Sequence, residues 1–327
     1  ITPIDVTAGG DSTPWFESRT EDQSTKADSA SFGLNLEWHV TDRSTLNFDA
    51  SRSTGDKTRK DRIVSMHDYT YNGADYQETS GSLTYNYNGS NIPTGTLVGV
   101  DLADVNSMRL SRYEEYPHEY TDEVDAFQVD FTQDVEWGFI SGLEVGARMS
   151  DRTFDSNRGT FLYGTRYGQD SAAGCDRNMT QNPVIPCSPL PLDGYVTVGS
   201  TPGAPDHLVV TDMQGLAEDV FGVGNFNGAK YWSDNWTFIE SGSLEEKVDS
   251  YYLMANMDFE IGNVHVRGNL GVRYVQSDVK ATGLQQVGAG LGTPITDAAG
   301  VTDDSYQLVT YGPDYTDTLP SLNLAFE

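Results

Sequence analysis

Carboxylates are the commonest reactive side chains in this sequence of 327 residues, which has 49 Asp and Glu against 20 Lys and Arg and a formal charge of −29. Neighbouring pairs occur at Glu114–Glu115, Glu245–Glu246 and Asp303–Asp304, and a glycosidase uses two carboxylates. In so acidic a chain such pairs arise by chance, so they do not predict an enzyme. The negative charge also excludes nucleic acid as an expected partner, because phosphates are repelled.

Histidine does not indicate a metal centre. The five histidines lie far apart and lack HExxH spacing: His39, His67, His118, His207 and His265. Acidic loops can hold divalent cations or attract a cationic ligand, but no D-x-[DN]-x-[DN]-G calcium loop is present. We therefore expect no catalytic residue, no metal and no cofactor.

The two cysteines, Cys175 and Cys187, lie in a polar stretch that contains no histidine. A zinc site normally has four ligands at close spacing. A disulfide that closes a surface loop is the better interpretation, and it implies an oxidising compartment. Loop closure of this length would stabilise the fold by roughly 3 kcal/mol.

Exposed aromatic rings in the long polar segment 155–246 are the best candidates for ligand contact, because such rings can stack on sugars. We single out Tyr231, Trp232 and Trp236. The alternative is that these rings pack the loop against itself.

The elements that must position these residues are strands with strict period-two alternation. Phe127, Val129 and Phe131 share one face with Val135 and Trp137, while the residues between them are polar. The same pattern recurs at 32–38, 46–50, 143–149, 251–261, 264–274 and 322–326. Such alternation predicts β-strands that separate an apolar space from a polar one.

The connections alternate between very short and long. Tight turns fall near residues 41–43, at Gly138 and at Gly262–Asn263, whereas long polar loops are predicted at 54–112, 155–246 and 281–304. Outer-membrane barrels confine short turns to one side and long extracellular loops to the other. Trp38 and Trp137 lie beside short turns, as interfacial aromatic residues do.

Composition agrees with this interpretation. The hydrophobic fraction is 37% and the mean hydropathy −0.47, which is low for a soluble globule. Only alternate residues of an outer-membrane strand face lipid. No run of 18 apolar residues is present, so no transmembrane helix is expected. We predict an all-β fold: a transmembrane antiparallel β-barrel segment, a meander of long hairpins with about seven to ten strands.

Four segments resemble the barrel domain of TonB-dependent receptors, in particular a carbohydrate-associated proteobacterial group. They are Glu123–Phe131, Gly142–Arg148, Val266–Tyr274 and Tyr315–Leu324. The last two are the most specific, and the string Tyr-Thr-Asp-Thr-Leu-Pro-Ser-Leu-Asn-Leu is similar to this group in particular. The resemblance covers about residues 115–155 and 248–327, and the loops match little.

The resemblance implies that residues 1–327 are part of one barrel domain of about 22 strands in the bacterial outer membrane. It implies import of a nutrient, with a glycan or oligosaccharide favoured and a siderophore or cobalamin as alternatives. Outer-membrane lipid and lipopolysaccharide would be partners, and the TonB–ExbB–ExbD system would act through a plug domain. The sequence shows no plug, no TonB box and no barrel-closing strand, so we expect a middle section of such a receptor.

A second hypothesis belongs to another class of protein. A secreted or surface-exposed β-sandwich, such as an adhesin or glycan-binding protein, also has alternating strands, but its apolar faces meet a second sheet. On the polar face, Arg148, Arg267 and Arg273 contact a plug or, as we rather expect, pair across strands with Asp130, Asp258 and Glu260.

Overall fold

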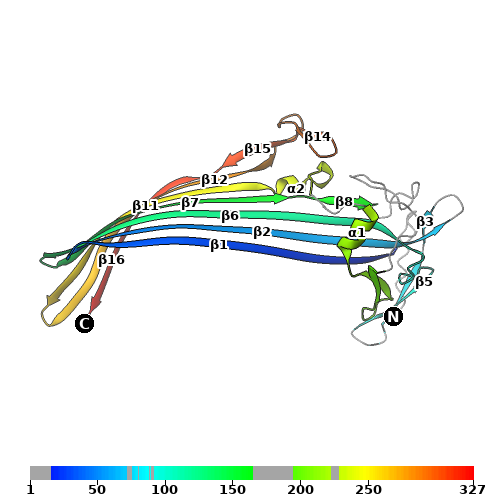
Figure 1. The fold of residues 1–327 in the computed structure, drawn as a ribbon, viewed down its shortest axis with the longest axis horizontal. Coiled ribbons are helices and arrows are strands. Elements are labelled where there is room, and N and C mark those ends of the chain that lie inside the picture. The colour runs from blue at the N-terminus through cyan, green and yellow to red at the C-terminus, as the bar shows by residue number, and fades with distance from the viewer. Residues whose placement is uncertain are drawn as a thin grey trace.

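The computed structural model describes residues 16–71, 76–79, 81–87, 89, 92–164, 194–221 and 228–327. Most of them form one antiparallel sheet of ten strands (Figure 1). Its main path runs β1-β2-β6-β7-β11-β12-β15, with β16 also on β12, β3 on β2 and β8 on β6. The all-β antiparallel class is therefore confirmed. The described sheet is open, with β1 at one edge and β15 and β16 at the other.

The principal strands are long. Their bounds are β1 Glu17–Thr41, β2 Ser44–Tyr71, β6 Met108–Trp137, β7 Ile140–Arg158, β11 Gly242–Ile261, β12 Val264–Gln286, β15 Tyr306–Tyr311 and β16 Asp314–Phe326. The 30 residues of β6 span about 100 Å at 3.4 Å per residue.

All three predicted tight turns lie at one end of the sheet, and the long connections lie at the other (Figure 1). Gly138 and Gly262 adopt φ values of 65° and 66° in these turns, a left-handed conformation that glycine reaches without a Cβ clash.

The predicted loops were too long, because the strands continue past the ends of the apolar alternation. β2 runs to Tyr71 rather than ending near residue 54, and β6 begins at Met108. Likewise β7 continues to Arg158, β11 begins at Gly242 and β12 ends at Gln286. Residues 54–62 of β2 have polar side chains on both faces, so alternation does not mark them, and beyond them Val64 and Met66 enter the hydrophobic core. The ladder between β2 and β6 continues through this region, with a register shift between Ser65 and Met66.

Small elements occupy the long connections. They are β3 Tyr76–Glu78, β4 Ser82–Asn86, β5 Thr94–Val98, β8 Phe161–Gly164, β9 Val196–Gly199, β10 His207–Val210, α1 Met213–Phe221, η2 Trp232–Asp234, α2 Trp236–Ile239, β13 Ile295–Thr296 and β14 Thr302–Asp303. No helix among the described residues is both long and apolar enough to cross a membrane.

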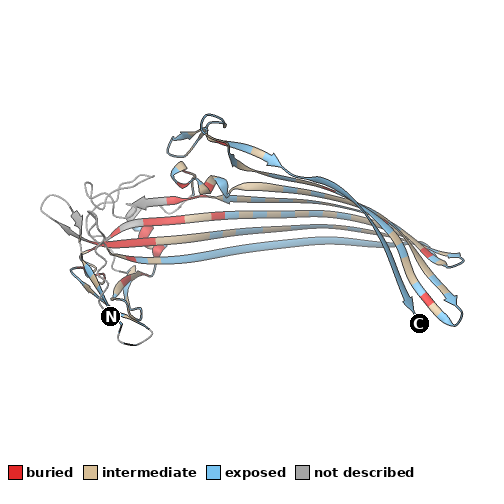
Figure 2. Ribbon diagram, turned by 180° about the vertical axis from the view of Figure 1, so that it is seen from behind, coloured by how far each residue is buried: buried red, intermediate tan, exposed pale blue. Residues whose placement is uncertain are grey.

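The hydrophobic core lies at the loop end of the sheet, away from the short turns (Figure 2). There β10 and α1 cover the ends of β1 and β2, and their contacts include Val64, Met66, Leu208 and Leu216. The central parts of the long strands have no comparable core, so packing does not explain the apolar residues of that region.

Candidate functional site

The central part of the sheet has one apolar face, and the register of the strands brings its side chains into continuous rows. We call this surface the apolar belt. It comprises Phe32, Leu34, Leu36, Trp38 and Val40 of β1, Leu46, Phe48 and Ala50 of β2, Phe127, Val129, Phe131, Val135 and Trp137 of β6, Leu143, Val145, Ala147 and Met149 of β7, Tyr251, Leu253, Ala255, Met257, Phe259 and Ile261 of β11, Val264, Val266, Leu270, Val272 and Tyr274 of β12, and Pro320, Leu322, Leu324 and Phe326 of β16.

Many belt side chains are exposed although they are large and apolar. Phe32 is 71% exposed, Trp38 57%, Leu253 55% and Phe326 66%. A contiguous apolar surface of this extent is unusual on a soluble monomer and marks contact with another apolar phase.

The belt carries no charge. Between its limits, every Asp, Glu, Lys and Arg of the seven strands lies on the opposite face. Ser44 and Gln133, which interrupt the belt near its turn end, are hydrogen-bonded to each other at 2.6 Å. Charged residues first occur on this face in the row of Phe32. In that row Arg52 of β2 and Asp125 of β6 form an ion pair at 3.5 Å.

The upper limit of the belt, on the loop side, shifts from strand to strand. On β1 the limit is Phe32, and the hydrogen-bonded row of Phe32 ends at Asp314 on β16. Relative to this row, the limit lies two residues nearer the turns at Phe127 on β6, four residues nearer at Tyr251 on β11 and six residues nearer at Pro320 on β16. From β1 to β16 the limit therefore shifts by about 20 Å along the strand direction, over a distance of about 29 Å across the sheet. If the upper limit of the belt is parallel to a membrane surface, the strands are tilted by about 35° from the membrane normal. This value lies at the lower end of the range of membrane barrels, about 35–45°.

The height of the belt follows from the same geometry. It extends over ten residue steps on β11, from Tyr251 to Ile261, and over eight on β1, from Phe32 to Val40. These are about 34 Å and 27 Å along the strands, or about 28 Å and 22 Å after a tilt of about 35°. The apolar band of outer-membrane barrels is about 25 Å tall.

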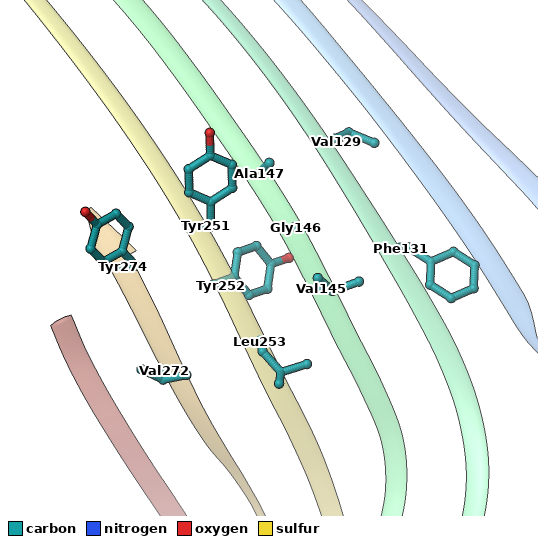
Figure 3. Close-up of a pocket in the computed structure, with 10 residues that line it drawn as sticks. All are labelled: Val129, Phe131, Val145, Gly146, Ala147, Tyr251, Tyr252, Leu253, Val272 and Tyr274. Atoms are coloured by element: carbon teal, nitrogen blue, oxygen red, sulfur yellow. The ribbon is translucent and has the colours of Figure 1, made fainter. Parts of the chain in front are cut away.

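A shallow hollow of about 450 Å³ lies within the belt (Figure 3). Its lining is aliphatic and aromatic and includes Val129, Val145, Leu253 and Tyr274. Apart from the hydroxyl groups of its tyrosines, its lining is carbon surface, so it offers contact to an apolar group and provides little for a polar ligand.

Behind this hollow, Tyr252 crosses Gly146 of β7 to reach β6 (Figure 3). Its Oη donates to Asp130 Oδ1 at 2.8 Å. A Cβ on residue 146 would lie 2.2 Å from Asp130 Oδ1 and 2.3 Å from Tyr252 Cε1. Glycine at this position therefore allows the hydrogen bond to span three strands.

The predicted arginine pairing is confirmed for one arginine. Arg267 Nε lies 3.5 Å from Asp258 Oδ2 on the neighbouring strand. Arg273 instead lies 5.6 Å from the centroid of the Tyr252 ring, and Asp130 accepts from tyrosine rather than from arginine.

Adjacent carboxylates are not brought together by the fold, because neighbours along a strand face opposite sides. Glu115 is buried and pairs with Lys60 at 2.8 Å and Arg62 at 3.2 Å, whereas Glu114 lies on the other face of β6. Asp304 accepts a hydrogen bond from the backbone of Gly290. The described residues hold no cluster of three or more potential metal ligands.

Trp232 joins two long connections to each other. Its ring stacks on Phe238 at 4.4 Å and on Tyr306 at 5.0 Å, and its Nε1 donates to Ile295 O at 2.9 Å. Its backbone N–H donates to Asp297 Oδ2 at 2.9 Å. Of the other two predicted ligand residues, Tyr231 is buried at 5% exposure and Trp236 is half-buried. The packing role of Trp232 corresponds to the alternative considered from the sequence.

The carboxylate of Asp297 accepts hydrogen bonds from several backbone N–H groups beside Trp232. Burial acts to raise its pKa, but the N–H groups of Trp232, Val301, Ala299 and Gly300 outweigh burial and hold the pKa of Asp297 below its usual value. The carboxylate therefore fixes a turn of the 287–305 connection against η2.

An aromatic cluster on the polar face above the belt was not predicted. Tyr116, His118 and Tyr120 alternate along β6, and Trp236 lies 5.4 Å from Tyr116 between ring centroids. The signal in the sequence was the alternation of rings at 116, 118 and 120.

The predicted disulfide residues, Cys175 and Cys187, lie outside the described residues. The chain matches no protein-family model, no curated protein and no solved structure.

Proposed function

We propose that this chain forms part of the wall of an outer-membrane β-barrel and that the barrel is a TonB-dependent receptor for a nutrient. The observation that carries the proposal is the charge-free belt, whose limit shifts by about one residue per strand. Its height of about 22–28 Å and its implied tilt of about 35° agree with the dimensions of membrane barrels.

Both the backbone and the side chains of the central strands suit a hydrocarbon environment. In hydrocarbon every backbone N–H and C=O needs a partner, and a ladder of strands provides one for each. Many of the apolar belt side chains are exposed, so contact with acyl chains removes them from water at about 25 cal/mol per Å².

The receptor part of the proposal rests on other features. Short turns gather at one end of the sheet and long connections at the other (Figure 1), as periplasmic turns and extracellular loops do. The resemblance of four strands to TonB-dependent receptors supplies the rest: a glycan or oligosaccharide as the favoured cargo, with siderophore or cobalamin as alternatives, and energy from TonB–ExbB–ExbD through a plug domain. On this proposal the chain has no catalytic role.

The β-sandwich alternative requires a second sheet over the apolar face. Among the described residues none covers the centre of the belt, where Leu36 is 55% and Leu270 53% exposed. This favours lipid over a second sheet as the partner of that face.

Brominated lipids test the proposal. Variants that keep a single tryptophan, either Trp38, Trp137 or Trp236, are reconstituted in phosphatidylcholine vesicles with bromine on the acyl chains. We expect quenching of Trp38 and Trp137, which lie on the belt, and none of Trp236, which lies above it on the polar face. If Trp38 is quenched no more than Trp236, the belt is not in contact with lipid.

A further inference from the structure

The polar face of β6 and β7 carries a ridge of rings above the level of the belt, which we call the aromatic track. Its members are Tyr116, His118, Tyr120, Phe154 and Trp236. His118 stacks on Tyr120 at 3.9 Å, Tyr120 lies 6.2 Å from Phe154, and Trp236 lies 5.4 Å from Tyr116. The four rings other than His118 are half-buried, so part of each remains accessible.

The neighbours of the track follow from the register of the strands. Tyr120 lies between Lys57 and Ser156, and Phe154 lies between Asp122 and Leu244. The carboxylate of Asp122 is paired with Arg152 at 2.7 Å. The half-buried rings of Tyr120 and Phe154 leave part of each open, and a flat six-membered ring can lie against that part.

Cations border the track on both sides, although the chain as a whole is strongly acidic. Lys57 Nζ lies 5.4 Å from the centroid of Tyr120, and the guanidinium of Arg158 lies 4.6 Å from that of Trp236. Arg158 also pairs with Glu240. Lys57 has no carboxylate partner among the described residues and is exposed, so its charge is available to a ligand.

His118 lies on the part of β6 above the belt. The groups that shift its pKa show which charges surround the track. Burial lowers its pKa, and the positive charges of Arg158, Arg59 and Lys230 lower it further, against the opposing effect of Glu240. Cations therefore outnumber carboxylates among the charged groups that act on His118.

We propose that the aromatic track binds an acidic oligosaccharide, with sugar rings stacked on Tyr120 and Phe154 and a carboxylate held by Lys57. Aromatic faces recognise a sugar ring whether or not it is charged, whereas the unpaired ammonium group distinguishes the acid from its neutral analogue. The track lies about 15–30 Å above the upper limit of the belt, at the end where the long connections meet. The inference deepens the proposed receptor function and rests on it for the direction in which the track faces.

The test compares two ligands that differ only in charge: the tetramer of α-1,4-galacturonic acid and its full methyl ester. Calorimetric titration of the whole chain in detergent micelles measures both affinities. We expect the acid to bind about tenfold more tightly at low salt, the equivalent of 1.4 kcal/mol, and the difference to shrink as salt screens the charge.

Two lysines provide a matched pair of variants. Lys57 pairs in register with Ala27, and Lys26, next to Ala27 on β1, projects from the opposite face of the sheet. Lys57→Gln should lower the affinity for the acid by about threefold and leave the ester unchanged, whereas Lys26→Gln should change neither. Tyr120→Leu should weaken both ligands by about tenfold.

Equal binding of the acid and the ester, or equal effects of the two lysine substitutions, would overturn the proposed recognition of charge. Absence of binding by either ligand would overturn the track as a sugar site. Quenching of Trp38 by brominated lipid is measured on the same purified protein after its reconstitution in vesicles. An embedded chain that binds neither ligand contradicts only the track, and a chain that binds the acid but is not embedded contradicts only the membrane wall.

Discussion

Arginine placed at different positions on the belt tests the tilt directly. Leu36 lies in the middle of the belt on β1, four residues from both Phe32 and Val40. Tyr274 lies in the same hydrogen-bonded row, five strands away, yet it is at the upper limit of the belt on β12. A tilt of about 35° therefore gives two residues of one row different depths in the bilayer.

The expected cost follows from these depths. An arginine on the lipid face costs about 2–4 kcal/mol at the midplane and about 0–1 kcal/mol near the interface. We therefore expect Leu36→Arg to lower the free energy of unfolding by about 2–4 kcal/mol and Tyr274→Arg by about 1 kcal/mol or less. Leu270, about 11 Å below the upper limit, should resemble Leu36.

The assay is a denaturant titration of the protein reconstituted in phosphatidylcholine vesicles, followed by tryptophan fluorescence. Asn269→Arg, next to Leu270 but on the polar face, is the control. It loses a hydrogen bond of 2.8 Å from Asn323 and should cost about 1 kcal/mol. Equal costs for Leu36→Arg and Tyr274→Arg would refute the slanted belt, and equal costs for Leu270→Arg and Asn269→Arg would refute a lipid-facing side altogether.

Two further predictions concern the polar face and the loops. Gly146→Ala should lower the free energy of unfolding by about 1–3 kcal/mol, because a Cβ 2.2 Å from Asp130 Oδ1 and 2.3 Å from Tyr252 Cε1 forces apart the groups that cross this strand; an unchanged denaturation midpoint would contradict it. The pKa of Asp297 is lower in the folded protein than in the unfolded chain, so the ionised carboxylate stabilises the fold. This stabilisation is fully present above the unfolded pKa of about 3.9 and is lost as the pH falls through the lower folded pKa. Trp232 fluorescence should report this loss, and Asp297→Asn should abolish the pH dependence.

The sequence by itself determined which residues form the central strands and which face each side chain occupies. Alternation of Phe127, Val129 and Phe131 with polar residues leaves one arrangement that separates the two kinds of side chain, since a shift by one residue would reverse every side chain of the strand. The turn at Gly262–Asn263 was equally local, because it needs a positive φ.

Only the tertiary structure decided how far the strands continue and how they are aligned. Residues 54–62 continue β2 with polar residues on both faces, so hydrophobic periodicity cannot mark them. The slant of the belt exists only in the register between strands, which hydrogen bonds set across segments far apart in the chain. The same register brings Asp130, Gly146 and Tyr252 into one row and Phe154 beside Tyr120. A local pattern can assign a residue to a face, but it carries no information about which distant residue lies opposite.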